Sequence, residues 1–357
     1  MSVDEFFVIR NLFAAYATSA GARGLRDDAA VLDAPGKLVV TTDTIVEGVH
    51  FLASDPIETV AMKALRVNVS DIVAKGARPT AALLNLVWSD ARDSSEIALF
   101  AQAFGRDLKL FGIDLIGGDT TSTPGPLTIS VTMFGEPLGV RVPARGDAQV
   151  GEDVWLIGGE IGSAWLGLQL RTGDIGLERL RQGRDEMQAQ IDSRALVREM
   201  PDYLKLPNED FDAEAAWLMT AYLAPFVRPE SAIIVSKFAS ASMDVSDGLV
   251  ADARKLADAS GVALKIEINA APFSIAAERW AFTGGDVRKL ITGGDDYIVL
   301  FTAPPALRGA IEAAEVGQAL RLCRIGVVEA GHGVTVVDRS GQAIAISDAG
   351  YSHQLGR

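Results

Sequence analysis

Apolar residues near the start of the chain recur at helical spacing. Within residues 4–17, Phe6, Ile9, Phe13 and Tyr16 fall roughly on one face of a helix. Because a spacing of three to four residues returns side chains to the same face, this pattern predicts an amphipathic helix.

The boundaries of a second helix are indicated by residues that begin and end helices. We interpret Asp55 as an N-cap, followed by Pro56 at the first helical position. The helix is expected to reach about Lys75, where Gly76 and then Pro79 end it.

Further apolar runs and amphipathic stretches alternate along the whole chain. Strands are predicted at 37–42, 80–88, 115–116, 127–134, 154–157, 262–268, 297–302 and 322–328, and helices at 94–111, 247–260 and 305–316. Since helices and strands mix in both halves, the fold class is expected to be α/β or α+β.

The chain has 357 residues, a length that favours about two domains. A segment rich in proline and glycine divides it near the middle. We therefore predict an N-terminal domain at 1–138, a linker at 139–150 and a C-terminal α/β domain at 151–357, with a charged helical elaboration at about 172–215.

Composition and charge narrow the functional classes. The chain is 48% hydrophobic with a formal net charge of −14, which makes nucleic acid a poor partner because phosphate backbones would be repelled. No apolar run is long enough to predict a membrane span. Cys323 is the single cysteine, so no intramolecular disulfide can form. These features, and a start without a basic leader, predict a cytoplasmic protein.

Aspartates recur where predicted elements end, beside glycines or hydroxyl residues. They are Asp27-Asp28 in LRDDAAVL, Asp43 in TTDTIVEGVHF, Asp71 in NVSDIVAKGA, Asp119 in IGGDTTS, Asp244 and Asp247 in MDVSDGL, and Asp295-Asp296 in TGGDDY. Mg²⁺ prefers oxygen ligands and usually takes one or two carboxylates together with substrate phosphates. Glycines let the backbone approach phosphate closely. The set therefore predicts several magnesium ions around a polyphosphate.

Each motif alone is weak, because an Asp-Gly or Gly-Gly-Asp sequence more often forms a turn. Asp71 lies inside a predicted helix, where a position on the solvent-exposed face would explain an aspartate without any role in binding. Motifs of other catalytic classes are absent from the sequence, which has no GxxxxGK[ST] phosphate-binding loop and no GxSxG nucleophile elbow. The segment 158–162 lacks the spacing of a dinucleotide fingerprint.

Taken in order, the motifs resemble those of the thiamine-monophosphate kinase family, within the superfamily that includes aminoimidazole ribonucleotide synthetase. The segments are DDAAVL, TTDTIVEGVHF, NVSDIVAKGARP, GGDTT, the glycines of 158–162, MDVSDGL, GGDDY and GYSH. They span nearly the whole chain, and the VEGVHF wording is typical of the thiamine branch.

The resemblance implies a two-domain homodimer that pairs through its N-terminal sheets, and an Mg²⁺-dependent reaction of ATP with thiamine monophosphate to give thiamine diphosphate. Asp43, Asp71 and Asp119 would be the catalytic carboxylates. The implied magnesium ligands are Asp28, Thr41, Thr42, Asp43, Asp71, Asp119, Asp244 and Asp247. Gly118, Asp119, Arg145 and Ser246 would contact ATP, and His50, Asp295 and Tyr351 would face the thiamine substrate.

Some positions depart from the family pattern. Arg26 stands where a glycine is usual, GGDDYI replaces GGEDYE, and 225–228 is altered. Arg145 could instead be a solvated charge, and Tyr351 could simply pack. The alternatives are another ATP-using member of the superfamily, either a synthetase or a selenophosphate-forming enzyme, a non-catalytic protein that binds nucleotide or thiamine phosphate, and a structural acidic protein.

Overall fold

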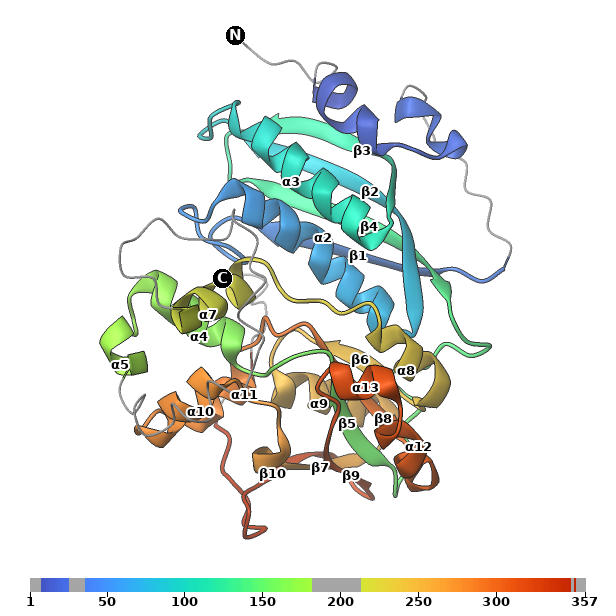
Figure 1. Ribbon diagram of the computed structural model, residues 1–357, viewed down its shortest axis with the longest axis vertical. Coiled ribbons are helices and arrows are strands. Elements are labelled where there is room, and N and C mark those ends of the chain that lie inside the picture. Colours follow the sequence, from blue (N-terminus) through green and yellow to red (C-terminus); the bar gives the residue numbers. More distant parts are fainter. Residues whose placement is uncertain (1–7, 26–35, 182–212, 348–349, 351–357) are drawn as a thin grey trace. The chain divides into compact units, whose positions relative to one another are not determined.

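The computed structural model describes residues 8–25, 36–181, 213–347 and 350 (Figure 1). The chain divides into two compact units. The first comprises Met1–Val142 with Pro229–Lys237, and the second comprises Pro143–Arg228 with Phe238–Arg357. The mixed α/β class predicted from the sequence is confirmed, since each unit is built on a sheet with packed helices.

The first unit is built on a four-stranded sheet with the order β1-β4-β2-β3. The strands are β1 Val39–Val46, β2 Ala77–Ser89, β3 Asp114–Thr123 and β4 Thr128–Pro137. β4 pairs antiparallel with both β1 and β2, and β2 pairs parallel with β3. Helices α2 (Ile57–Ala74) and α3 (Glu96–Phe111) pack on this sheet (Figure 1).

Helix α2 is buried on nearly all sides, and its Arg66 forms an ion pair with α3. Arg66, which is 7% exposed, donates from Nε and Nη2 to both carboxylate oxygens of Asp107 on α3, at 2.6 and 3.1 Å. A two-point contact of this kind compensates the buried charges and fixes how the two helices face each other.

The predicted start of α2 was wrong in its detail. Pro56 occupies the N-cap position, without a capping side chain, and Ile57 is the first helical residue. The carboxylate of Asp55 accepts a hydrogen bond from the backbone N–H of Leu52 at 2.8 Å, so it stabilises the preceding turn. The predicted end near Lys75 is confirmed.

Short helical segments precede the first sheet, and α8 returns to this unit. They are η1 Ile9–Phe13, a π-helix, with the 3-10 helices η2 Ala14–Tyr16 and η3 Ala20–Leu25; α8 is Ser231–Phe238. The helical prediction for 4–17 is thus confirmed only over its described part, and not as one α-helix. Phe13 packs edge-on against Phe100 of α3, with ring centroids 6.5 Å apart.

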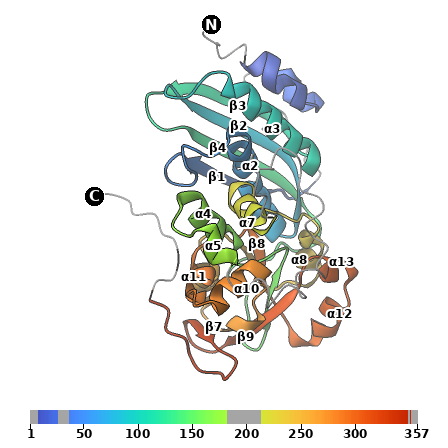
Figure 2. The same cartoon turned by 60° about the vertical axis from the view of Figure 1, so that its left-hand side comes forward.

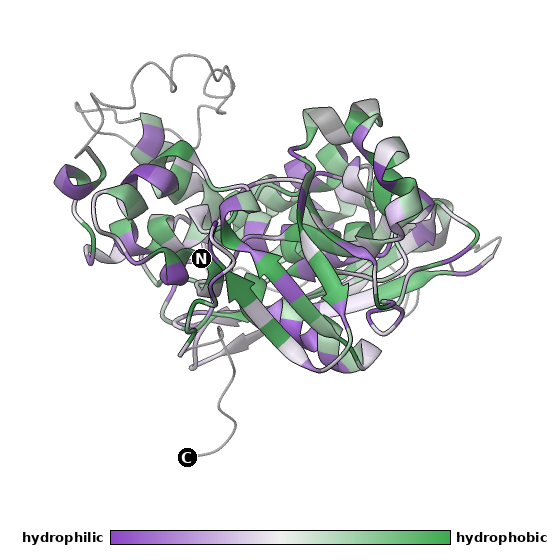
Figure 3. Ribbon diagram, turned by 90° about the horizontal axis from the view of Figure 1, so that it is seen from below, coloured by the Kyte–Doolittle hydropathy of each residue, from purple (hydrophilic) through white to green (hydrophobic). Residues whose placement is uncertain are grey.

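The second unit is built on a six-stranded sheet with the order β10-β7-β9-β5-β8-β6. The strands are β5 Asp153–Ile157, β6 Ser242–Val245, β7 Ala263–Glu267, β8 Ile298–Ala303, β9 Cys323–Glu329 and β10 Gly333–Val337. β10 and β7 are parallel and the other pairs are antiparallel. Every residue of β5 and β8 is buried. Figure 3, coloured by hydropathy, shows hydrophobic residues along several strands of the structure.

Helices of the second unit cover this sheet, and α4 packs beside α7 (Figure 2). They are α4 Ser163–Thr172, α5 Leu177–Arg181, α7 Ala213–Leu223, α9 Leu249–Ser260, α10 Ile275–Phe282, α11 Val287–Thr292, α12 Arg308–Glu312 and α13 Glu315–Ala319, with 3-10 helices η6 Ile268–Ala270 and η7 Pro305–Leu307. α9 ends at Ser260, as predicted, and Gly261 follows it in the left-handed conformation.

Two predictions for the second unit were incomplete. The helix expected over 305–316 is divided into η7, α12 and the start of α13. Strand β6 was missed because it has only four residues, Ser242–Val245, too few for a clear period, and it overlaps the start of the MDVSDGL motif. Most of 172–215 lies outside the described residues. None of the described helices is long and apolar enough to cross a membrane.

Candidate active site

Two predicted site residues meet between β1 and α2 in the first unit. Thr41 on β1 donates its hydroxyl hydrogen to Oδ2 of Asp71 on α2 at 2.5 Å. Asp43 lies two residues further along β1, so strand alternation places it on the same face as Thr41. Thr42 points to the other face, where its hydroxyl is 3.1 Å from that of Thr132.

Asn68 supports this part of the site, although the pattern of aspartates does not point to it. Its amide oxygen accepts a hydrogen bond from the backbone N–H of Asp43 at 3.0 Å, and its amide nitrogen donates to the carbonyl of Ala64 at 3.1 Å. Asn68 is fully buried. The signal was present in the NVSD motif, because Asn68 and Asp71 stand three residues apart and share one helix face.

Gly118 and Asp119 lie in the parallel strand β3, opposite Leu84 and Asn85 of β2. Gly118 has φ +147°, and a Cβ at this position would lie 1.8 Å from the carbonyl oxygen of Leu84. Glycine is therefore required for β3 to approach β2 here. Asp119 is exposed, and its Oδ1 accepts a hydrogen bond from the N–H of Thr120 at 3.0 Å.

His50 closes a turn after β1. Its Nδ1 accepts a hydrogen bond from the backbone N–H of Val46 at 3.0 Å. An accepting Nδ1 carries no proton, so the neutral ring is protonated at Nε2. The turn thus fixes both the orientation and the tautomer of this histidine.

In the second unit, the loop after β6 carries Ser246 and Asp247. The backbone N–H groups of both residues donate to Oδ2 of Asp252, each at 2.9 Å. Asp252 is fully buried on the first turn of α9. Its carboxylate therefore holds the loop against the helix that follows. Asp244 lies on β6 and is 8% exposed.

Two glycines let this loop lie against the loop before β8. Gly248 has φ +107°, and its Cβ would lie 2.8 Å from the carbonyl carbon of Thr292. Gly294 has φ +77°, and its Cβ would lie 2.6 Å from the carbonyl oxygen of Ser246. The backbone N–H of Asp295 donates to that same oxygen at 2.7 Å. The MDVSDGL and GGDDY motifs, about 50 residues apart in sequence, are thereby adjacent.

Lys255 supplies the local positive charge. Its ammonium donates to Asp247 and, at 2.7 Å, to Oδ1 of Asp252. Burial acts to lower the pKa of Lys255, but the two carboxylate partners leave it above its ordinary value. Burial raises the pKa of Asp252 despite the nearby ammonium.

The remaining predicted residues are placed as follows. Arg145 is exposed in a loop, and its carbonyl accepts a hydrogen bond from Ser260 at 3.0 Å. Asp28 and Tyr351 lie outside the described residues. Within the part of the chain that the structure describes, no three His, Cys, Asp or Glu side chains are grouped closely enough to hold a metal ion.

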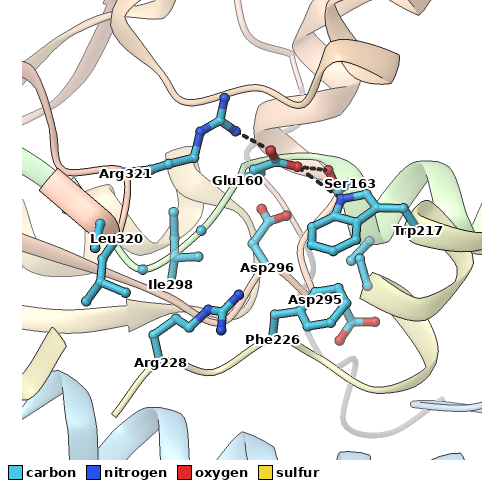
Figure 4. A pocket seen from close by; sticks show the side chains of 15 residues that line it. Glu160, Ser163, Trp217, Phe226, Arg228, Asp295, Asp296, Ile298, Leu320 and Arg321 are labelled. Carbon is cyan, nitrogen blue, oxygen red and sulfur yellow. Dashed lines mark hydrogen bonds and ion pairs between the residues drawn. The ribbon is translucent and has the colours of Figure 1, made fainter. Parts of the chain in front are cut away.

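A pocket in the second unit includes Asp295 in its lining (Figure 4). Phe226 and Arg228, from the segment that departs from the family pattern, also line it. The pocket therefore places one predicted substrate residue beside a segment to which the sequence assigned no role.

Comparison with known proteins first defines the class. Residues 26–136 match the family described as AIR synthase related protein, N-terminal domain. This range covers the first sheet through β4 and includes the Asp43, Asp71 and Asp119 motifs. The fold and the aspartate motifs together define an AIR synthase-like protein.

More specific relatives give the family. The thiamine-monophosphate kinase of Caulobacter vibrioides is 32% identical over 336 residues, which cover 92% of this chain and 84% of that protein. The crystal structure of thiamine-monophosphate kinase from Stenotrophomonas maltophilia K279a is 32% identical, with a TM-score of 0.71, and the match covers 89% of this chain and 90% of that one. AaThiL complexed with AMPPCP and TMP is 29% identical, with a TM-score of 0.69 and coverage of 98% and 97%. The chain belongs to the thiamine-monophosphate kinase family.

Proposed function

We propose that this protein transfers the γ-phosphoryl group of ATP to the phosphate of thiamine monophosphate, giving ADP and thiamine diphosphate with the help of Mg²⁺. The observation that carries this proposal is the 32% identity to a thiamine-monophosphate kinase over 92% of the chain. A relative of similar fold binds an ATP analogue together with TMP, so both substrates of the proposed reaction are accommodated by this architecture.

The chemistry asks little of a general base. The attacking atom is a phosphate oxygen that already carries negative charge, so the main obstacle is repulsion between two polyanions. Positioning and charge neutralisation lower that barrier. A mechanism of this kind agrees with the many aspartates of the motifs and with a sequence that lacks the GxxxxGK[ST] loop.

The donor set fits a hard cation, because the candidate residues offer carboxylate and hydroxyl oxygens. In the first unit Thr41, Asp43, Asp71 and Asp119 would hold magnesium through their side chains. The Thr42 hydroxyl lies on the other face of β1, so Thr42 would offer only its backbone oxygen to this site. In the second unit Asp244 and Asp247 would do so, and Asp28 completes the proposed set. Bound Mg²⁺ would neutralise phosphate charge and fix the geometry of in-line transfer.

The chain's own residues position the substrates. We assign Gly118, Asp119, Arg145 and Ser246 to ATP, with Asp43, Asp71 and Asp119 as the catalytic carboxylates. His50, Asp295 and Tyr351 are assigned to the thiamine substrate. Two buried side chains position these residues. Asn68 accepts a hydrogen bond from the backbone N–H of Asp43, and Asp252 accepts hydrogen bonds from the N–H groups of Ser246 and Asp247.

We also propose a homodimer formed through the first sheet. Helices α2 and α3 pack on one side of this sheet, whereas β1 exposes Val40, at 55%, together with Thr42 and Thr44. Static light scattering on a size-exclusion column tests this, and a concentration-independent monomer mass would contradict it. A cytoplasmic location, supported by the lone cysteine, is tested by cell fractionation.

The first experiment measures ADP release from Mg-ATP with and without thiamine monophosphate and identifies the product. Strict dependence on that acceptor, with thiamine diphosphate formed and with loss of turnover after chelation of the metal, is the expected result. Binding of ATP without such turnover would contradict the kinase and favour a different acceptor or a binding role.

A further inference from the structure

The turn at 47–53 follows β1 directly and carries His50 at its centre. The backbone N–H of Gly48 closes it by donating to the carbonyl of Phe51 at 2.8 Å. The Phe51 side chain is buried, at 2% exposure, and anchors the turn in the first unit. These contacts give the turn its shape, whereas its position depends on what holds its two ends.

One side chain, Arg92, binds both ends of this turn. Its Nε donates to Oε2 of Glu47 at 2.7 Å, and its Nη2 donates to the backbone carbonyl of Ala53 at 3.1 Å. The side chains of Arg92 and Glu47 are 9% and 20% exposed, so solvent screens their ion pair less than it screens a surface pair. Because the guanidinium is planar and rigid, donation to both groups fixes the distance between the two ends.

Arg92 is itself held by groups outside the turn. Its backbone N–H donates to the carbonyl of Ser89, the last residue of β2, at 3.0 Å. Its Nη1 donates to Oε2 of Glu96, in the first turn of α3, at 3.1 Å. The hydroxyl of Ser89 donates in turn to the carbonyl of Gly125 at 2.7 Å. The guanidinium therefore ties the His50 turn to the end of β2 and to the start of α3.

The surroundings of Arg92 distinguish it from an exposed arginine of the same unit. Burial acts to lower the pKa of Arg92, but hydrogen bonds and charge from Glu47 and Glu96 leave it above its ordinary value. Arg78 forms a single contact of 2.6 Å with Glu136, and these two side chains are 65% and 39% exposed. Exposed pairs of that kind contribute little to stability, so Arg78 is a matched control for Arg92.

We propose that Arg92 is a positioning residue for thiamine monophosphate: by joining Glu47 to Ala53, it sets the place and the orientation of His50. The inference rests on the proposed function, which assigns His50 to that substrate. Arg92 acts through the turn, since its guanidinium is engaged with Glu47, Ala53 and Glu96. Its loss should therefore weaken the capture of thiamine monophosphate more than it slows the chemical step.

Steady-state kinetics of the full-length protein tests the effect on the substrate. Arg92→Ala should raise KM for thiamine monophosphate roughly tenfold, because the turn loses two hydrogen bonds that hold it in place. KM for Mg-ATP should stay within about twofold and kcat within about threefold of wild type. Arg78→Ala should leave all of these constants unchanged. Equal rises of both KM values in Arg92→Ala, or a fall in kcat alone, would overturn the proposal.

Two variants of Glu47 separate the hydrogen bond from an effect on folding. Glu47→Gln keeps an oxygen that accepts from Nε of Arg92, so KM for thiamine monophosphate should stay within about threefold of wild type. Glu47→Ala removes that oxygen and should reproduce most of the rise expected for Arg92→Ala. The pair decides the question even where Arg92→Ala fails to fold, because equal KM values in the two Glu47 variants would overturn the proposal.

The imidazole of His50 gives a readout that does not depend on turnover. The chain has only 3 histidines, so isotope-labelled histidine yields few ring signals in nuclear magnetic resonance, and His50→Gln identifies those of His50. In wild type Nδ1 accepts the N–H of Val46 and the neutral ring carries its proton on Nε2. Arg92→Ala should mix the two tautomers and shift both ring nitrogens, whereas Arg78→Ala should not. Unchanged His50 signals in Arg92→Ala would overturn the proposal.

The two readouts separate this inference from the kinase activity. Absence of thiamine diphosphate formation in wild type would refute the proposed function, while the ring signals would still show whether Arg92 sets the orientation of His50. An active wild type, with a raised KM but unchanged His50 signals in Arg92→Ala, would overturn the route through His50 and leave the kinase in place.

Discussion

The amide oxygen of Asn68 lies 3.0 Å from the backbone nitrogen of Asp43 and accepts its hydrogen bond, so a buried side chain of α2 sets the position of a predicted metal ligand on β1. One helical turn later, Asp71 receives the hydroxyl of Thr41 at 2.5 Å. Two side chains of one helix therefore hold two alternate residues of one strand.

Substitution of Asn68 by Ala should destabilise the fold and weaken metal-dependent activity together. The change leaves the buried N–H of Asp43 without an acceptor, which costs about 1–3 kcal/mol. Urea unfolding measures the stability, and a magnesium titration of turnover measures the activity. Gln102→Ala, at an exposed position of α3, is the control, and equal losses in both variants would contradict the role of Asn68.

Asp43→Asn and Asp71→Asn should each lower turnover by orders of magnitude while leaving the melting temperature nearly unchanged. Asparagine keeps the size of the side chain but removes the charge that a hard cation requires. Steady-state kinetics and thermal unfolding provide the measurements. Asp90→Asn, an exposed acid of the same unit, should behave as wild type, and near-normal turnover in either site variant would refute the assignment.

Gly248→Ala should be markedly more destabilising than Gly261→Ala. Both glycines have positive φ, but a Cβ at Gly248 meets the backbone of Thr292 at 2.8 Å, whereas a Cβ at Gly261 meets nothing within 4 Å. Gly261→Ala should cost about 1 kcal/mol from backbone strain alone, and Gly248→Ala should exceed it and also impair ATP binding. Chemical unfolding compares the pair, and equal costs would show that the two loops are not tightly apposed.

Asp296→Asn should stabilise the protein increasingly as pH rises above 4. The pKa of Asp296 is raised in the folded state by burial, so the folded protein holds this proton more tightly than the unfolded chain. Wild type therefore loses stability as pH rises from the ordinary value, about 3.9, to the raised one, and the variant does not. Unfolding free energies of both proteins measured from pH 4 to 8 test this, because a constant difference would mean that Asp296 does not titrate as inferred.

Local sequence signals were most reliable where a single element decided the outcome. The ends of α2 near Lys75 and of α9 at Ser260 were predicted because the residues that end a helix act within one helical turn. The N-cap at Asp55 failed because the carboxylate had a competing local partner, the N–H of Leu52. That choice between two nearby backbone groups is not visible in a residue pattern.

The sequence by itself determined the mixed α/β class, the aspartate motifs and the family, since these depend on residue types and their order. Only the tertiary structure decided that Gly294 brings the GGDDY loop against Ser246, that α8 packs with the first unit, and that Asp296 keeps a buried oxygen without a described partner. Each of these features is a contact, or a missing contact, between segments that lie far apart in the chain. The packing of a whole unit decides which segments meet, and therefore which atoms are buried and which find a hydrogen-bond partner.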